Sequence, residues 1–558
     1  MIWLWLSVVH AAALEDVLVA ELARAQTTLA TRDEKPHYMA LAVEERESIN
    51  ISARAGTLAQ SDDDFTRSLD VEMRVGTPAL DSTHPLRGFS SLEDSARDAV
   101  ELPIGDADSY ALRHTVWREI DRRYRDESER IVMIRANRSV KVEEEDTSPD
   151  FEARAGAVDR KPPAPIVVDK VAWEKRLVEL SKLLEVDPDV HWGSAQLQAS
   201  HVTTTFVDTE GARLVYGVNL VRVSLSVSTT APDGDQVHVF LSKDAHDPSG
   251  LPTDAELTAW AHEATTKLDA LRKAPRGTPY SGPVILDGRA TAVFFHEVFG
   301  HRVEGTRQKK EDEGKTFAEY VGEPILPAFI DVVDDPTRER WGTTDLNGYY
   351  TWDDEGVAAA PAQLVTDGKF VGFMMDRSPI KGFPHSNGHG RRMAGNAPVA
   401  RMANTIVTAD QTVTQAKLRA LLLDEVKKQG LEYGMLVEEI DGGFTLTGRM
   451  APNSFNVRAS TSWQVFADGR PDQLVRGIDL VGTPLVAFNS IIAAGDDAQV
   501  FNGFCGAESG WVPVSGVAPT ILFKRLEFQL KEKGQERPPL LVKPGAPQDD
   551  GATDGGEQ

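Results

Sequence analysis

Apolar and polar residues alternate along several stretches in the first half of the chain, and this period of two is typical of half-buried β-strands. Three of these stretches are rich in β-branched residues, and turn residues at 209–211 and 232–234 separate them. The strands expected on this basis are residues 38–53, 64–75, 201–208, 213–230 and 235–242. Because the last three follow one another through short turns, we expect an antiparallel sheet.

Longer segments of this half predict helices. They are residues 14–29, 90–99, 111–136, 169–186 and 253–273. The last helix is expected to begin at a Thr253-Asp254 cap and to end at the sequence A-P-R-G, residues 274–277, because proline and glycine interrupt a helix. We therefore expect an α+β fold with two domains. The N-terminal α/β domain with antiparallel strands would cover residues 14–273, and a C-terminal β-rich domain would cover residues 274–530.

The second half of the chain predicts short strands joined by glycine-rich turns. A strand at residues 284–287 leads into an apolar helix that carries the sequence H-E-x-x-x-H at residues 296–301. The charged residues 307–315 that follow are expected to form a mobile rim or lid. The polar end of the chain, residues 531–558, is expected to be a disordered acidic tail.

Residues 1–13 are apolar and end in three alanines. The segment is shorter than the roughly 20 residues that span a bilayer as a helix, and its alanines satisfy the A-x-A cleavage pattern of a signal peptide. No lysine or arginine lies in the segment, although such signals usually begin with one. We expect an export signal and a location in the periplasm or cell envelope. The alternatives are an apolar helix end or a misassigned start, with the protein in the cytoplasm.

Charge and cysteine content narrow the classes of function. The 558 residues include 86 acidic and 60 basic side chains, which gives a formal net charge of −26. A field of this sign repels phosphate backbones, so nucleic acid is not expected as a partner. Cys505 is the only cysteine, and the chain can therefore form no internal disulfide.

The H-E-x-x-x-H sequence places His296 and His301 on either side of Glu297. Imidazole is the commonest metal ligand in proteins, and a glutamate beside a metal-bound water can act as its general base. On an ideal α-helix, residues five apart lie about 140° apart around the axis. The two histidines can therefore share one metal ion only through a π-bulge or through an early helix end at Gly300.

Cys505 is a candidate for a third ligand. It lies between glycines in N-G-F-C-G-A-E-S-G, residues 502–510, which is typical of a loop. Two histidines and one thiolate would leave a fourth position open for water, the pattern of a catalytic zinc site. The alternative is a small buried hydrophobic residue without a ligand role.

Motifs in the second half of the chain resemble those of the TldD/PmbA metallopeptidases. They keep the family's order from about residue 274 to 528, whereas the first half matches only in its pattern of elements. The similar segments are P-V-I-L at residues 283–286, H-E-x-x-x-H at 296–301, D-D-E-G at 353–356, N-G-H-G-R-R at 387–392, P-V-A-R-M-A-N-T at 398–405, D-G-G at 441–443 with L-T-G at 446–448, and C-G at 505–506 with V-P-V-S-G at 512–516 and P-T at 519–520.

The resemblance implies that His296, His301 and Cys505 bind zinc and that Glu297 is catalytic. Partner subunits of the family that are not catalytic lack this ligand set, so the resemblance points to the TldD-like type. One departure is the segment after the cysteine, where the family usually has C-G-K-x-G-Q and this chain has C-G-A-E-S-G at residues 505–510. It puts in doubt any role of the lysine and glutamine in the substrate groove or in holding the cysteine loop.

Other acidic residues in and near these motifs are expected to have supporting roles. Metal-bound imidazoles usually donate their other N–H to a carboxylate or carbonyl. Glu304 is a candidate for such a partner, or else an ordinary surface acid. Asp353, Asp354 and Glu355 are expected to shape a loop or bind substrate, because the resemblance already supplies a complete ligand set.

The resemblance implies a zinc-dependent peptidase that hydrolyses unfolded or extended peptides. Glu297 would take the proton of a zinc-activated water and pass it to the leaving amine. Family members enclose their substrate between two subunits, which implies a homodimer or a heterodimer with a related subunit, and a peptide bound along a strand edge. Two alternatives stay open: a metal-binding partner subunit that does not cleave, and a zinc hydrolase of a non-peptide substrate.

Overall fold

The computed structural model describes most of the chain. The described residues are 3–86, 99–106, 108–138, 146–185, 187, 189–310, 313–445, 447–448 and 454–532, with the backbone alone for residues 3–13. The tail expected to be disordered, residues 531–558, lies outside them from residue 533 onward. In this part of the chain, no helix is both long and apolar enough to cross a membrane.

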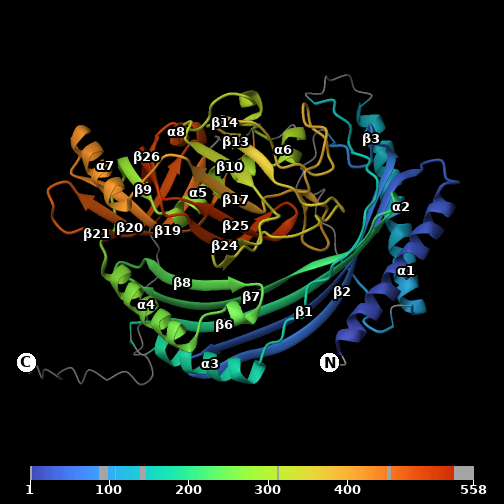
Figure 1. Ribbon diagram of the computed structural model, residues 1–558, viewed down its shortest axis with the longest axis horizontal. Coiled ribbons are helices and arrows are strands. Elements are labelled where there is room, and N and C mark those ends of the chain that lie inside the picture. Colours follow the sequence, from blue (N-terminus) through green and yellow to red (C-terminus); the bar gives the residue numbers. More distant parts are fainter. Residues whose placement is uncertain are drawn as a thin grey trace, which may run out of the picture.

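The first half of the chain forms one large curved sheet (Figure 1). Its strands are β1 (Pro36–Arg54), β2 (Thr57–Thr77), β3 (Leu80–Asp81), β4 (Val100–Glu101), β5 (Val158–Arg160), β6 (Trp192–Asp208), β7 (Arg213–Thr230) and β8 (Gln236–Ala245). Their order is β3-β2-β1-β6-β7-β5, with β4 beside β2 and β8 beside β7. The long strands pair antiparallel, as expected from their short connections.

Helices pack on one face of this sheet (Figure 1). They are α1 (Trp3–Leu29), α2 (Tyr110–Arg138), α3 (Lys170–Leu184) and α4 (Asp254–Lys273). The alternation along β1 explains this arrangement. Leu41, Val43 and Ile51 are fully buried in the cores beneath the helices, whereas Glu44 and Arg46 line a cleft on the opposite face. The sheet therefore turns a polar face toward the second half of the chain.

The expected strands and helices that fall on described residues of this half are confirmed, with differences at their ends. The helix expected at residues 90–99 lies outside the described residues except for residue 99. β7 covers the expected residues 213–230, and α4 follows the expected cap, where Thr253 and Glu256 form a capping box. β6 begins at Trp192 rather than at residue 201, because residues 192–200 continue the ladder with β7. α1 begins at Trp3, so its backbone includes most of the expected export signal, which stays a prediction.

The second half contains shorter elements. Its main strands are β9 (Tyr280–Leu286), β10 (Ile330–Asp334), β13 (Ala362–Thr366), β14 (Lys369–Phe370), β17 (Asn404–Ala409), β18 (Thr412–Val413), β19 (Tyr433–Thr445), β20 (Phe455–Phe466), β21 (Gln473–Val475), β22 (Ile478–Gly482), β23 (Ile491–Gly495), β24 (Gln499–Ala507), β25 (Gly510–Ala518) and β26 (Ile521–Leu530). Two-residue pairs join β11 (Arg340–Trp341) to β12 (Thr344–Asp345) and β15 (Gly390–Arg391) to β16 (Val399–Ala400). The helices are α5 (Gly288–Val298), α6 (Gly305–Lys309), α7 (Gln415–Lys428) and α8 (Pro484–Phe488).

These strands form two further sheets. A six-stranded sheet has the order β14-β13-β10-β17-β25-β24, so among the described strands β24 lies at an edge and pairs with β25 alone. An eight-stranded sheet follows the order β18-β23-β26-β22-β20-β19-β9, with β21 beside β20 and a further pairing of β9 with β26. Strands up to Ala245 thus lie in the first sheet and those from Tyr280 in the others, while a domain boundary at residue 274 stays a prediction.

α5 lies in the apolar core of the second half. The ring of Phe294 meets those of Phe455, Phe488 and Phe523 edge to face, and Phe295 stacks on Phe488. Such aromatic contacts have preferred geometries, and several of them together fix the direction and rotation of a helix. They therefore also fix the side chains at the C-terminal end of α5.

Candidate metal centre

The H-E-x-x-x-H sequence spans the end of α5. His296 is in the last turn of the helix, which ends at Val298, and His301 is in a 3-10 turn formed by Gly300–Arg302. The structure thus has the second of the two expected arrangements, an early helix end. A side chain on residue 300 would force Met402 to move, because a Cβ there would lie 2.0 Å from the sulfur of Met402.

Cys505 approaches these histidines from a distant part of the sequence. Its Sγ lies 3.5 Å from Nε2 of His301, and one ligand atom from each of His296, His301 and Cys505 lies within 4.8 Å of the other two. The imidazole rings of His296 and His301 are nearly perpendicular, at 82°, with centroids 5.1 Å apart. The three residues are at most 8% exposed. The residues expected to share a metal ion therefore converge.

The expectation of a loop around Cys505 was wrong. Cys505 is in β24, opposite Val512 of β25. The glycines that suggested a loop have their place in this hairpin: a Cβ on Gly506 would lie 3.0 Å from the ring of Trp511, its partner across the ladder. Glycine at this position allows a large ring to cross the strand, so the backbone stays extended.

The spacing and chemistry of these donors fit zinc. Bonds of about 2.0–2.1 Å to nitrogen and about 2.3 Å to sulfur, at a tetrahedral angle, separate the two donor atoms by about 3.5 Å. His301 Nε2 and Cys505 Sγ are 3.5 Å apart. Imidazole and thiolate are also the ligand types that zinc prefers, and three protein donors leave a fourth position.

Charges around the donors favour the thiolate. Burial alone raises the pKa of the Cys505 thiol, but His301 and His296 beside it outweigh burial and hold that pKa well below its ordinary value. Burial lowers the pKa of His301, and the charges of Cys505 and Glu304 outweigh it and raise the pKa to about 10. Because the thiolate is the form that binds metals, the arrangement prepares Cys505 as a ligand.

Glu304 contacts the other nitrogen of the His301 ring. Its Oε2 lies 3.2 Å from His301 Nδ1, and Glu304 is only 1% exposed. The contact leaves Nε2 directed toward Cys505. Glu304 thus occupies the place expected of a partner that orients a metal-binding imidazole, and the alternative of a surface acid was wrong.

The prediction of a mobile, charged rim at residues 307–315 was wrong for its first residue, Arg307. Arg307 is largely buried and donates hydrogen bonds to Glu304 (2.7 Å), Glu313 (2.9 Å) and Glu508 (2.7 Å). Its charge suggested solvent exposure, but carboxylates from separate parts of the chain converge on it. Such pairing compensates the desolvation of a guanidinium.

Arg401 lies in the motif P-V-A-R-M-A-N-T and has no role predicted from the sequence. Arg401 is fully buried and donates to the carbonyl oxygen of Cys505 (2.8 Å), to Oγ of Ser509 (2.6 Å) and to the carbonyl oxygen of Gly510 (3.1 Å). Its Nε lies 3.6 Å from Oε1 of Glu304. The only signal in the sequence was an arginine inside a motif of apolar and amide residues.

Glu297 follows His296 in α5 and differs from its neighbours in burial. All other residues of α5 are buried except Arg289. Glu297 is partly exposed, and its backbone oxygen accepts a hydrogen bond of 3.1 Å from Arg302. A partly exposed carboxylate directly beside a buried ligand can exchange protons with water.

The D-D-E-G segment shapes a loop, as one of its expected roles required. Oδ1 of Asp353 accepts from the backbone N–H groups of Glu355 (3.0 Å) and Val357 (2.8 Å), and its Oδ2 accepts from that of Gly390 (3.0 Å). Asp354 accepts from the N–H of Arg392 (2.8 Å). These acids are not among the described residues that cluster as metal donors.

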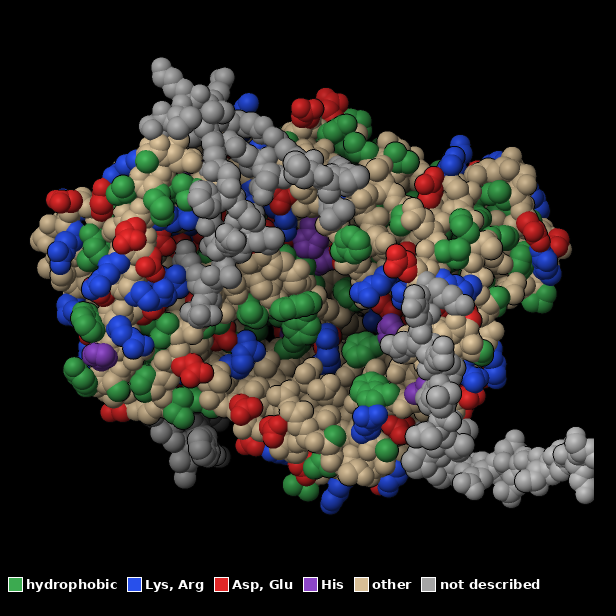
Figure 2. Space-filling view, turned by 180° about the vertical axis from the view of Figure 1, so that it is seen from behind, with side chains coloured by type: hydrophobic (Ala, Val, Ile, Leu, Met, Phe, Trp, Pro, Cys, Tyr) green, Lys and Arg blue, Asp and Glu red, His purple; other side chains and the backbone are tan. Residues whose placement is uncertain are grey.

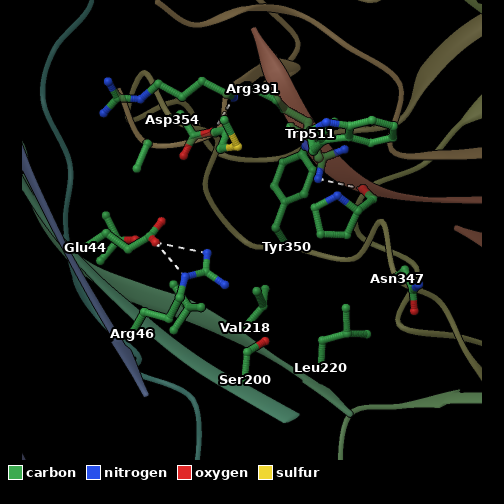
Figure 3. Close-up of a pocket in the computed structure, with 18 of the residues that line it drawn as sticks. Glu44, Arg46, Ser200, Val218, Leu220, Asn347, Tyr350, Asp354, Arg391 and Trp511 are labelled. Carbon is green, nitrogen blue, oxygen red and sulfur yellow. Dashed lines mark hydrogen bonds and ion pairs between the residues drawn. The ribbon is translucent and has the colours of Figure 1, made fainter. Parts of the chain in front are cut away.

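A cleft of about 600 Å³ separates the first sheet from the β24–β25 hairpin. Its floor is the polar face of the sheet, with Arg46 and Ser200, and its roof includes Tyr350 and Trp511 (Figure 3). The surface is hollowed between the lower part of the molecule and the upper part (Figure 2). Phe504 also lines the cleft, so the strand that carries Cys505 directs its neighbouring side chain into this space.

The fold and the converging donors together define a class: a mixed α/β protein with a buried His–His–Cys centre suited to a metal ion. Residues 279–530 match the family model described as the PmbA/TldA metallopeptidase C-terminal domain. This half of the chain is therefore similar to the C-terminal domain of the TldD/PmbA metallopeptidases.

Curated relatives carry matching names. The chain is 27% identical over 325 residues to a metalloprotease of Methanothermobacter thermautotrophicus, covering 57% of this chain and 65% of the relative. It is 25% identical over 254 residues to a zinc metalloprotease TldD homolog of Saccharolobus solfataricus, covering 45% of this chain and 52% of the relative. The matches therefore span between about half and two thirds of these proteins.

A solved structure shares the overall fold. TldE from Thermococcus kodakarensis superposes with a TM-score of 0.58 at 14% sequence identity, covering 92% of this chain and 100% of that chain. The likeness includes the first half of the chain, which the family model does not cover. At this identity it shows the fold alone.

Proposed function

We propose that the protein is a zinc-dependent peptidase that hydrolyses unfolded or extended peptides. The observation that carries the proposal is the convergence of His296, His301 and Cys505 beside Glu297 in a chain similar to a metallopeptidase family. The donor set fits zinc, and one curated relative is named a zinc metalloprotease. Three donors and one open position are typical of catalytic rather than structural zinc sites.

In this proposal, different residues of the chain bind the metal, transfer the proton and orient a ligand. His296, His301 and Cys505 would hold the metal, and bound zinc would supply a Lewis acid that lowers the pKa of water. Glu297 takes the proton from the attacking water and gives it to the leaving amine, which is typically worth about two to four orders of magnitude in rate. Glu304 fixes the ring of His301 through Nδ1.

The cleft between the first sheet and the β24–β25 hairpin is the proposed place for an extended peptide. Its polar floor and aromatic roof suit a chain with both backbone polar groups and apolar side chains. Phe504, which precedes Cys505, and Trp511, which pairs with Gly506, line the cleft, so substrate bound there would lie next to the strand that carries a ligand.

The assembly and location are proposed on the same basis. The family resemblance supports a homodimer or a heterodimer with a related subunit. Export to the periplasm or cell envelope rests on residues 1–13, and mass spectrometry of the mature N-terminus tests it: retention of these residues would exclude a cleaved signal.

Cleavage of an unfolded protein by wild type and by Glu297→Gln tests the activity. We expect the variant to retain zinc and to lose at least about two orders of magnitude in rate, the usual share of a general base. Glu263→Gln is a matched control, because Glu263 also follows a histidine in a helix but is exposed. It should cleave like wild type.

The outcomes separate the alternative functions. A wild-type protein that binds zinc without cleaving peptides would contradict the proposal and favour a partner subunit or a hydrolase of another substrate. Equal cleavage by wild type and Glu297→Gln would contradict the role of Glu297 alone.

A further inference from the structure

We propose that Glu508 and Ser509 are positioning residues that fasten the hairpin carrying Cys505 to Glu304, through Arg307 and Arg401, and so set the distance between the Cys505 thiolate and His301. The inference deepens the proposed function, on which its relevance to catalysis rests. Both residues lie in the segment where the chain departs from the family, C-G-A-E-S-G in place of C-G-K-x-G-Q.

The position of Cys505 creates the need for such a fastening. Cys505 is near the end of β24, an edge strand whose only neighbour among the described strands is β25. The ladder fixes the strand within the sheet, but the last residues of an edge hairpin have hydrogen-bonding groups on one side without a strand partner. The distance from Sγ to His301 therefore depends on contacts made by the tip of the hairpin.

The first contact runs through Arg307. Oε2 of Glu508 accepts a hydrogen bond of 2.7 Å from Arg307, whose Nε donates to Oε2 of Glu304 at 2.7 Å. The same oxygen of Glu304 lies 3.2 Å from His301 Nδ1. One guanidinium thus connects the tip of the hairpin to the carboxylate that orients a ligand ring.

The second contact runs through Arg401. One of its terminal nitrogens donates to Oγ of Ser509 at 2.6 Å, and the other donates to the carbonyl oxygen of Cys505 at 2.8 Å. Its Nε lies 3.6 Å from the second oxygen of Glu304. Arg401 thus holds the ligand residue by its own backbone as well as by the residue four positions further on.

The two paths share Glu304 and end in one turn, so they form a closed ring of contacts around the donors. The side chain of Glu508 is 7% exposed, and Ser509 and Arg401 are fully buried. Water screens buried charge pairs little, and planar guanidinium groups hold their acceptors in fixed directions. The ring therefore restricts the hairpin tip more than surface ion pairs would.

The chemistry of the substituted segment supports the assignment. The chain lacks the family's lysine and glutamine there, yet it supplies a carboxylate and a hydroxyl that each accept from a buried arginine. Residues that orient metal ligands typically contribute about 10–100-fold to metal affinity. We expect a contribution of that size from Glu508 and a smaller one from Ser509.

Zinc binding and thiol accessibility test the proposal. The variants are Glu508→Gln, which keeps the shape and removes the charge, and Ser509→Ala, which removes one hydroxyl. The control is Glu45→Gln, which weakens a partly buried pair with Arg67 (2.7 Å) in the first sheet. Competition with a chromophoric chelator measures zinc affinity, the cobalt-substituted protein reports the sulfur-to-metal absorption band, and alkylation of metal-free protein measures access to Cys505.

We expect Glu508→Gln to bind zinc about 10–100-fold more weakly, to shift the cobalt–sulfur band and to react faster with the alkylating reagent. Glu45→Gln should match wild type in all three, and Glu508→Asp should recover part of the affinity. In cleavage assays, kcat should fall while KM stays unchanged. Ser509→Ala should show the same changes on a smaller scale, and it serves if Glu508→Gln fails to fold.

The proposal would be overturned if both variants fold and have the same zinc affinity, cobalt spectrum and alkylation rate as wild type. Its failure is distinguishable from failure of the proposed function. If wild type binds zinc but cleaves no peptide, the affinity and spectrum still decide the role of the hairpin ring. If wild type binds no zinc, the alkylation rates of the metal-free proteins decide it.

Discussion

Two groups of buried charges lie on either side of α6, and they differ in their balance of cations and carboxylates. The site cluster comprises Glu304, Glu313, Glu508, Arg307 and Arg401. The acid cluster comprises Asp353, Glu355, Asp376 and Arg74. α6 joins the two: Arg307 belongs to the first, while Thr306 donates a hydrogen bond of 2.6 Å to Asp376 in the second.

The pKa values of the carboxyl groups in the two clusters are shifted in opposite directions. Burial alone raises a carboxyl pKa, because it disfavours the charged form. At Glu304, His301 and Arg307 outweigh burial and hold the pKa well below its ordinary value. At Glu355, burial and the neighbouring carboxyl groups of Asp376 and Asp353 raise the pKa well above its ordinary value. Similar burial therefore gives fixed charges in one cluster and bound protons in the other, according to the cations within reach.

The largest effect is expected when Cys505, the donor that the site cluster supports, is replaced. A complete zinc site is worth about 10–16 kcal/mol, so Cys505→Ala should lose several kcal/mol, or roughly three orders of magnitude in zinc affinity, and cleavage with it. Metal analysis and cleavage of an unfolded protein measure both. Retention of metal by the folded variant would contradict Cys505 as a ligand.

Removal of a cation should leave the site cluster with unbalanced carboxylates, as in the acid cluster, and so destabilise the fold. Arg307→Met leaves Glu304, Glu313 and Glu508 with less positive charge, and breaking such buried pairs typically costs about 3–5 kcal/mol. Urea unfolding measures the loss. Arg419→Met, which breaks an exposed pair with Asp472, is the control and should cost about 1 kcal/mol or less. Equal losses in the two variants would contradict the distinction between the buried cluster and a surface pair.

The acid cluster should make stability depend on pH. Burial raises the pKa of Asp353 to about 7, and it also raises the pKa of Glu355. The folded protein then holds protons that the unfolded chain releases near pH 4. This contribution to stability is present below about pH 4 and is lost as pH rises toward 7, at up to about 1.4 kcal/mol per pH unit for each proton.

Glu355→Gln tests this dependence, because glutamine keeps the acceptor for the N–H of Arg377 and does not ionise. Urea unfolding at pH 5, 6 and 7 should show a shallower decline in stability with pH than in wild type. An unchanged slope would show that Glu355 is not the group that binds the protons.

The smallest effect is expected in the cleft, outside both clusters. Trp511 is 63% exposed and lines the cleft, so Trp511→Ala removes apolar contact area without disturbing the core. Loss of about 1 kcal/mol of such contact would raise KM about fivefold and leave kcat unchanged. A fall in kcat with unchanged KM would place Trp511 outside the substrate path.

Local patterns in the sequence predicted the first sheet well. β7 and α4 have the expected residues because alternation and a capping box act between neighbours in the chain. Local patterns failed where long-range contacts replaced solvent. Arg307 is charged yet largely buried, because Glu304, Glu313 and Glu508 surround it. Cys505 is flanked by glycine yet extended, because β25 pairs with it.

The sequence by itself determined the kinds of donor at the centre, the candidate base and the resemblance to a family, since these follow from residue types at fixed spacing. Only the tertiary structure decided that α5 ends before Gly300, that Cys505 lies 3.5 Å from His301, and that Arg307 and Arg401 join the hairpin to Glu304. The reason is physical. The pKa of a buried group and the position of an edge strand depend on which distant charges lie within a few ångströms, and a linear pattern does not contain that information.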